Sequence, residues 1–390
     1  MYIMESLQKP REGIVEFYAY ISQKVSSDLQ VFYNPRMEFN RNFSVCAANV
    51  LCRKRENVSI CDALSASGIM GLRYICEVEN VTEVFFCDKN PEAINLISRN
   101  LELNGFKFVK NEHGKRIFEK NGKRAIVIKE NALRMLSTNI FTGVDLDPYG
   151  TPAPFLDSVA RATYWKGFAF ITATDTAALT GSSPNACLRK YGIFSSRVCF
   201  SKELGARILL SAVIKAFAIH GKAFLPRAVL YHEHFYRVFG EVLPRESEIT
   251  KLMKRFEIIS YCEKCKRWFE EPREKCACNE KTKTIGPLYT GSILDKGFLN
   301  ELYIELEKRG FEKEKRVCKT MLEEAEITTP FYYNLHEFCS ALKINPPKIE
   351  RVIENLKALG FKASRTHFDA LGIKTNADWH AFKEILLSTE

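Results

Sequence analysis

The chain has 390 residues, of which 46% are hydrophobic and 27% charged, with a net charge of +10. This length is enough for two or three domains with cores of their own, and the composition is that of an ordinary globular protein. No apolar run reaches the eighteen residues of a membrane span, and the first ten residues lack the apolar core of a secretory signal, so we expect no membrane association.

The thirteen cysteines indicate the cellular compartment, and the net positive charge indicates the kind of partner. Most of the cysteines lie in apolar surroundings, which is typical of a reducing, intracellular compartment rather than a disulfide framework. We expect the cytoplasm, or the nucleus if the source is a eukaryote. The positive charge favours a polyanionic partner, and nothing in the sequence points to an obligate protein partner.

The first predicted elements form a βαβ pattern. Val58–Asp62 reads as a short strand, Leu72–Val78 as the start of a helix, and Val81–Asp88 as a strand buried on both faces. Asn90 can cap a second helix that ends at Asn104. Strand, loop, helix, strand and helix in this order predict an open parallel sheet.

The later segments predict a second domain. A basic hairpin that turns at Asn121-Gly122 is inserted in the sheet pattern, and a strand at 168–174, a helix at 204–220 and a strand at 228–239 follow. From about residue 250 charged residues become dense and cysteines cluster. We therefore divide the chain into domains 1–250 and 251–390.

The end of the chain predicts a small helical module. Residues 297–326 are typical of charged helices. Helices at about 333–343 and 349–359, followed by a strand at 361–368, indicate a winged-helix-like arrangement.

The loop Asp62–Gly71 is the first candidate site. Its small residues let the backbone approach a ligand, and the following helix offers free N–H groups suited to the carboxylate of an amino-acid moiety. The loop lacks the first glycine of a full Gly-x-Gly-x-x-Gly, which counts against a dinucleotide. The candidate binding residues are Asp62 and Ser65 in the loop, Asp88 at the position of a ribose-binding acid, and Asn131 and Ala132 at an adenine edge. A turn that binds nothing is the alternative.

Residues 145–150 read Asp-Leu-Asp-Pro-Tyr-Gly and follow a predicted strand. If the upstream loop binds S-adenosylmethionine, this hexapeptide predicts methylation of an amine on a nucleobase. Methyl transfer requires the amine in line with the methyl group, and the poorly nucleophilic amine of guanine also requires a proton acceptor. The assigned roles are proton acceptor for Asp147, second acceptor for the Pro148 carbonyl, stacking for Tyr149 and Phe32, and orientation for Asp145. A β-turn without chemistry is the alternative.

Four cysteines lie within one short polar segment, as Cys262-x-x-Cys265 and Cys276-x-Cys278. Four thiolates give zinc a closed tetrahedral site without an open position for catalysis. We therefore predict a structural zinc site, although the single residue between the second pair departs from the commonest spacing. Surface thiols without metal are the alternative.

Taken together, these motifs resemble the tRNA (guanine-26-N2)-dimethyltransferase family, Trm1. Phe32–Met37 with Asn40-Arg41 is similar to the opening motif of the family, and 62–68 and 145–150 are similar to its cofactor and catalytic motifs. Further similarity at 172–176, 187–191, 286–289 and 365–368 extends the resemblance over about residues 10–380. One departure is Met70, where family members often carry arginine.

The resemblance implies a Rossmann-like class I methyltransferase domain followed by a smaller α+β C-terminal domain that helps to hold tRNA. S-adenosylmethionine would be the donor, and one or two methyl groups would go to the exocyclic N2 of guanine 26. Arg41, Asp88, Asn131 and Ala132 would contact the cofactor, with Asp147 catalytic and Phe32 and Tyr149 around the base.

Two other interpretations stay open at this point. One is an amine methyltransferase acting on another nucleic acid, such as ribosomal RNA guanine or DNA adenine. The other is a non-catalytic, zinc-bearing RNA-binding protein. Carbon methylation of a pyrimidine is disfavoured because no cysteine lies beside Asp147-Pro148.

Overall fold

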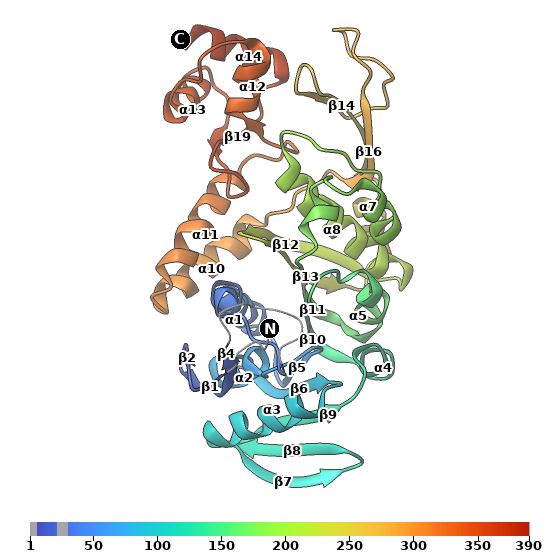
Figure 1. Ribbon diagram of the computed structural model, residues 1–390, viewed down its shortest axis with the longest axis vertical. Helices are drawn as coiled ribbons and strands as arrows, with labels where there is room; N and C mark the ends of the chain where they lie inside the picture. The colour runs from blue at the N-terminus through green and yellow to red at the C-terminus, as the bar shows by residue number, and fades with distance from the viewer. Residues whose placement is uncertain (1–5, 22–29, 390) are drawn as a thin grey trace. The chain divides into compact units, whose positions relative to one another are not determined.

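A computed structural model describes residues 6–21 and 30–389, and they divide into two compact units (Figure 1). The first unit combines residues 1–172, 239–244 and 304–314, and the second combines 173–238, 245–303 and 315–390. The units are therefore built from interleaved segments. The predicted boundary near residue 250 divides the chain along its sequence into a methyltransferase domain and a tRNA-binding domain. This division stays a prediction.

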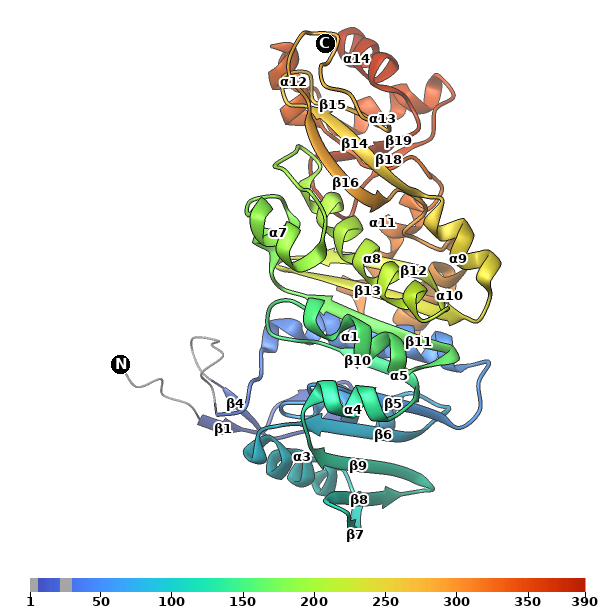
Figure 2. The same ribbon diagram turned by 90° about the vertical axis from the view of Figure 1, so that its right-hand side faces the viewer.

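The first unit is built on a mixed sheet with strand order β11-β10-β5-β6-β9-β8-β7 (Figure 2). The first five of these strands are parallel to their neighbours, and β8 and β7 are antiparallel additions at the edge. The strands are β5 (Val58–Asp62), β6 (Val81–Asp88), β7 (Lys107–Glu112), β8 (Lys115–Lys120), β9 (Lys123–Lys129), β10 (Phe141–Leu146) and β11 (Thr163–Ala173). Two short pairs precede them, β1 (Ser6–Gln8) with β4 (Ala19–Ile21) and β2 (Arg11–Glu12) with β3 (Val15–Glu16).

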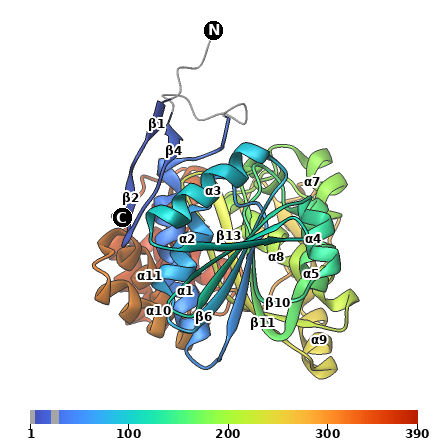
Figure 3. The ribbon, with the colours of Figure 1, turned by 90° about the horizontal axis from the view of Figure 1, so that it is seen from below.

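Helices cover both faces of this sheet, with α2 and α3 on one side and α4 and α5 on the other (Figure 3). This arrangement explains why β6, which has helices on both sides, is largely apolar. The helical elements are η1 (Pro35–Met37), α1 (Glu38–Cys52), α2 (Ile69–Glu77), α3 (Pro91–Leu103), α4 (Ala132–Thr138), η2 (Ala153–Phe155) and α5 (Leu156–Ala162).

Several predicted elements of this unit are confirmed. β5 and β6 have the predicted bounds, and the Asn90 side chain caps α3 by accepting from the Glu92 N–H. The hairpin at Asn121-Gly122 is present, but its description as an insertion was wrong. Its second strand, β9, runs parallel to β6 as a strand of the central sheet. The prediction also missed β7, because all six of its residues are exposed and it lacks an apolar face.

The second unit contains two smaller sheets, β15-β14-β16 and β17-β19-β18, and the neighbouring strands β12 and β13. Its strands are β12 (Ala223–His232), β13 (Phe235–Leu243, whose end belongs to the first unit), β14 (Phe256–Cys262), β15 (Arg267–Phe269), β16 (Lys283–Tyr289), β17 (Tyr333–Asn334), β18 (Ala363–Arg365) and β19 (Gly372–Thr375). Its helices are α6 (Thr176–Leu179), α7 (Pro184–Tyr191), α8 (Ser201–Ile219), α9 (Glu246–Met253), α10 (Lys296–Lys308), α11 (Glu312–Glu324), α12 (Leu335–Leu342), α13 (Ile349–Ala358) and α14 (Trp379–Ser388), of which α10 and α11 cross the division.

One predicted strand of this unit was wrong. Residues 228–239 are not one strand but the inner parts of β12 and β13, which turn at Glu233-His234. This turn lacks the Asn-Gly or Gly-Gly signal that makes a hairpin visible in a sequence.

The C-terminal module agrees with the winged-helix-like prediction. α12 and α13 correspond to the two predicted helices. The predicted strand at 361–368 is shorter in the structure, where β18 pairs with β19. In the part of the chain that the structure describes, every helix is too short or too polar to cross a membrane.

Candidate active site

The carboxyl ends of the central strands bring four predicted acids to one edge of the sheet. Asp62 ends β5, Asp88 ends β6, and Asp145 and Asp147 lie at the end of β10. β10, β5 and β6 are adjacent parallel strands, and Asp145 pairs with Asp62 in the ladder. Ligands of open α/β sheets bind at this edge.

Two of these acids are buried beside one another. Asp62 is 5% exposed and Asp145 2%. The Gly71 N–H donates to Asp62 Oδ2 at 3.0 Å, and the Tyr74 hydroxyl donates to Asp145 Oδ2 at 2.5 Å. Burial, followed by the charge of Asp145, raises the pKa of Asp62 well above its usual value. A ligand with positive charge would stabilise the ionised form of Asp62.

The candidate cofactor loop is held tightly at the end of β5. The Ser65 hydroxyl donates to the Asp62 carbonyl at 2.8 Å and accepts from the Cys87 N–H at 2.9 Å, so it joins the ends of β5 and β6. Gly68 has φ of 77° and precedes α2 without a side-chain cap. α2 therefore begins at Ile69, three residues before the predicted start, and its first N–H groups face the loop.

Asp88 connects this loop to the next helix. Its Oδ2 accepts from the Ala66 N–H at 2.9 Å and its Oδ1 from the Asn90 N–H at 2.8 Å. Each carboxylate oxygen keeps a second lone pair, so Asp88 can still accept from a diol. Asn131 caps α4 by accepting from the Leu133 N–H, and Ala132 is buried at the first position of that helix.

The residues assigned to the base lie together. The rings of Phe32 and Tyr149 are 5.6 Å apart at 70°. Tyr149 is 69% exposed, Pro148 is buried, and Asp147 is half-buried. An aromatic ring that is exposed beside a carboxylate can receive a planar ligand without displacing the core.

Asp147 also has a buried partner that the sequence did not single out. The Asn40 amide, on α1, donates to Asp147 Oδ2 at 3.3 Å. Asn40 has no exposed surface, and its own carbonyl oxygen accepts from the Ser44 hydroxyl at 3.4 Å. Its amide is therefore fixed in a position to orient the carboxylate.

Arg41, the next residue of α1, is held by a buried acid. Its guanidinium donates to both carboxylate oxygens of Glu12, at 2.7 and 2.6 Å, and to the Asn34 carbonyl at 3.2 Å. The Tyr33 hydroxyl donates to Glu12 at 2.9 Å, and Arg73 Nη1 lies 3.6 Å from Glu12 Oε2. One buried glutamate thus pairs with two arginines and fixes the predicted cofactor arginine.

Sequence reasoning therefore missed three supporting residues. Asn40 was visible only as the neighbour of Arg41 in a motif. Glu12 lies in a polar segment, and its burial depends on the short β2–β3 pair, which has no apolar pattern. Tyr74 reads as one more residue of the apolar face of α2.

In the second unit, the four predicted zinc ligands come together. The sulfur atoms of Cys262, Cys265, Cys276 and Cys278 all lie within 4.8 Å of one another. The Sγ atoms of Cys262 and Cys278 are 3.6 Å apart, and two thiolates on one tetrahedral zinc would be about 3.8 Å apart. These four residues could therefore hold a metal ion.

The backbone of this cluster also suits a metal. The Cys265 N–H points at the Cys262 sulfur at 3.5 Å, and Lys266 and Asn279, directly after each pair, have positive φ. The cluster is attached to the C-terminal module, because the Trp379 indole donates to the Cys265 carbonyl at 2.9 Å. A metal here would brace that module.

Comparison with known proteins decides the family. The family model for N2,N2-dimethylguanosine tRNA methyltransferases matches residues 12–387. The chain belongs to this family. It is 36% identical over 376 residues to the tRNA (guanine(26)-N(2))-dimethyltransferase of Methanosarcina acetivorans, covering 91% of each chain.

Two further similarities cover nearly the whole chain. The tRNA (guanine(26)-N(2)/guanine(27)-N(2))-dimethyltransferase of Aquifex aeolicus is 34% identical over 390 residues, covering 97% of this chain and 95% of the relative. The solved structure of Trm1 from Pyrococcus horikoshii with S-adenosyl-L-methionine is similar with a TM-score of 0.87 and 29% identity, over 97% of this chain and 100% of that one. The fold is thus the predicted methyltransferase core followed by a C-terminal domain.

Proposed function

We propose that this chain transfers one or two methyl groups from S-adenosylmethionine to the exocyclic N2 of guanine 26 in tRNA. The observation that carries the proposal is the position of Asp147. It lies two residues before Tyr149, whose ring contacts that of Phe32, and it follows the strand end at the sheet edge that also holds Asp62, Asp88 and Asp145. A planar base and a donor bound at this edge would meet at Asp147.

The residues at the strand ends fit S-adenosylmethionine. The ligand would bring a sulfonium and an ammonium group to the buried carboxylates Asp62 and Asp145, where burial and then the charge of Asp145 raise the pKa of Asp62. Its carboxylate would meet the amino end of α2 and the guanidinium of Arg41, and its ribose would meet Asp88. When bound, it supplies an electrophilic methyl group.

The chain's own residues would position the acceptor. Tyr149 and Phe32 would hold the guanine ring, and Asp147 would accept the hydrogen bond of its amine and then the proton that the amine loses. Asn40 would keep one oxygen of Asp147 engaged, so that the other faces the base. The Pro148 carbonyl would be a second acceptor.

tRNA is the expected partner. Guanine must leave its stack to enter the site, which costs a few kcal/mol, and contacts of the basic chain with RNA phosphates would offset that cost. The second unit, with a structural zinc on its four cysteines, would contribute to this binding.

The test is nucleoside analysis of an unmodified tRNA transcript after incubation with the protein and labelled S-adenosylmethionine. We expect N2-methylguanosine or N2,N2-dimethylguanosine that maps to position 26. A transcript in which guanine 26 is replaced by adenine should take up no label. Label at another position only, or in ribosomal RNA but not in tRNA, would contradict the proposal.

A further inference from the structure

The edge of the first unit's sheet carries much of the positive charge of the chain. Residues 107–129, which form β7, β8 and β9, contain eight lysines and arginines against two glutamates. This net +6 compares with +10 for the whole chain. We call this segment the basic edge. Its charge has no part in the active site described above.

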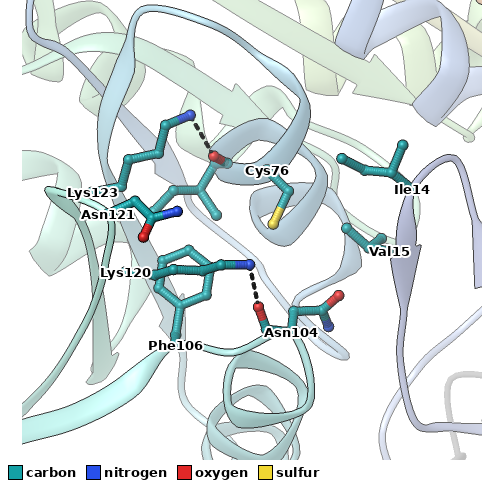
Figure 4. Close-up of a pocket in the computed structure, with 9 residues that line it drawn as sticks. Ile14, Val15, Cys76, Asn104, Phe106, Lys120, Asn121 and Lys123 are labelled. Carbon is teal, nitrogen blue, oxygen red and sulfur yellow. Dashed lines mark hydrogen bonds between the residues drawn. The ribbon is translucent and has the colours of Figure 1, made fainter.

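Half of these cations are occupied in the fold. The Lys123 ammonium donates to the carbonyls of Ile75 and Val78 at the end of α2, and the Lys120 ammonium donates to the carbonyl of Asn104 at the end of α3. Both lysines thus cap helix ends, and both line a cavity of about 200 Å³ (Figure 4). Arg116 donates to two side chains of α3, and Arg124 pairs with Glu83 at 2.9 Å. These four residues have structural roles.

The remaining four cations have no such role. Lys110 pairs only with Glu112, at 2.8 Å, and both side chains are at least half exposed. Within the described chain, no ion pair or hydrogen bond engages the side chains of Lys107, Lys115 and Lys129. Exposed lysines on an edge strand also prevent association of sheets, so their presence alone does not indicate a partner.

Their register distinguishes them. Arg116 on β8 lies level with Asp62 and Asp145 across the intervening strands. Its neighbour Lys115 pairs with Ile128 on β9, which in turn pairs with Cys87 on β6. Lys115 is thus one residue nearer the carboxyl edge, level with the residue that precedes Asp147. Four strand spacings, roughly 19 Å, separate β8 from β10.

The turn between β7 and β8 and the end of β9 lie near this level. His113 and Gly114 both have positive φ, and they connect Glu112 to Lys115 in a tight hairpin. Lys110 lies two residues before Glu112 on β7. Lys129 ends β9 opposite Asp88. Lys115 and Lys129 therefore lie at the sheet edge where the candidate site lies. Lys110, which pairs only with Glu112, lies opposite Ile117, two residues further from that edge than Lys115, and Lys107 lies at the other end of β7.

We propose that the carboxyl-edge end of the basic edge, formed by Lys110, Lys115 and Lys129, binds phosphates of the substrate tRNA beside its target guanine. This inference rests on the proposed function. A polyanion is favoured over a second copy of the chain, because two such edges would repel each other. An RNA with one base at Asp147 would need to extend roughly 19 Å, a few nucleotides, to reach this edge.

The experiment measures binding of an unmodified tRNA transcript between 50 and 200 mM salt, and steady-state methylation. We expect Lys115→Gln to weaken binding about fivefold and the double variant Lys110→Gln/Lys115→Gln about tenfold or more, with kcat unchanged at saturating tRNA. Each lost contact should reduce the slope of log Kd against log salt by about 0.7 to 0.9. Glu112→Gln should instead tighten binding, because it removes an opposing charge.

Lys107→Gln is the matched control. It removes one exposed lysine from the same segment, but this lysine lies about 14 Å from Lys115 along the strand direction. Because this distance exceeds the screening length of physiological salt, tRNA affinity should stay within twofold. If Lys115→Gln and the double variant bind tRNA as Lys107→Gln does, the inference is overturned and the lysines only protect the sheet edge. Failure of the wild-type protein to methylate tRNA would instead refute the proposed function.

Discussion

The two candidate sites, the strand-end acids of the first unit and the cysteine cluster of the second, differ in how they are closed. Tyr149 is 69% exposed and Asp147 is half-buried, so the first site is open to a large ligand. The four sulfur atoms of the second site lie within 4.8 Å of one another, which leaves no position for a substrate. The difference indicates chemistry in the first and bracing in the second.

The sites also differ in what supports them. Backbone N–H groups, a tyrosine and an asparagine hold the acids, and these supports come from α1, α2 and the loop after β5. The cysteines are supported mainly by their own two turns. Changes at the open site should therefore alter rates and affinities, whereas changes at the closed site should alter stability.

Asp147→Asn is the largest expected effect. The amide keeps the size of the side chain but cannot take up a proton, so methyl transfer should fall about 10³-fold while tRNA affinity changes little. Single-turnover methylation and equilibrium binding measure the two quantities. Asp157→Asn, an exposed acid paired with Arg161 on α5, is the control and should retain full activity. Near wild-type turnover of Asp147→Asn would remove the catalytic role.

Cys265→Ser tests the structural role of the cysteine cluster. We expect bound zinc to fall from about one per chain to nearly none, and the unfolding temperature to fall by about 5–10 °C, because metal binding is part of the folding free energy. S-adenosylmethionine affinity should change less than twofold.

Cys318→Ser makes the same chemical change at a buried thiol of α11, outside the cluster, and should retain the metal. Metal analysis and thermal unfolding provide both readings. A wild-type protein without zinc would show that the cluster is a set of free thiols.

Asn40→Ala tests the support of the open site. Without its amide, Asp147 loses one fixed hydrogen bond, and we expect kcat to fall about tenfold with the KM for tRNA unchanged. Ser44→Ala, which removes only the contact behind Asn40, should have a smaller effect in the same direction. An increase in KM without a change in kcat would mean that Asn40 serves binding rather than orientation.

The sequence made the ends of the strands predictable, because β5 and β6 are apolar and bounded by recognisable loops. It also indicated the cysteine cluster, where spacing alone suffices. It could not indicate Glu12, since the burial of that residue depends on two-residue strands and on arginines that are distant in the chain. The β12–β13 turn and the exposed strand β7 were missed for the same reason: tertiary context, rather than local pattern, determines them.

Asp62→Asn has the smallest expected effect, and its sign is unusual. Burial and Asp145 raise the pKa of Asp62 in the folded state, so as pH rises above the unfolded value near 4 the unfolded chain releases a proton that the folded chain retains. This carboxyl group therefore lowers stability progressively as pH rises from that value to its raised pKa, and the loss remains at higher pH. Asparagine can still accept from Gly71 but cannot ionise.

We expect the cofactor-free variant to gain about 2–4 °C over the wild type at pH 7.5, and less at pH 5, while losing affinity for S-adenosylmethionine. Asp157→Asn, which removes an exposed carboxylate instead of a buried one, is the control. Thermal unfolding across this pH range measures the difference. If the variant is equally destabilised at every pH, Asp62 contributes to packing instead. If the variant is more stable but binds S-adenosylmethionine more weakly, Asp62 serves ligand binding and lowers the stability of the fold.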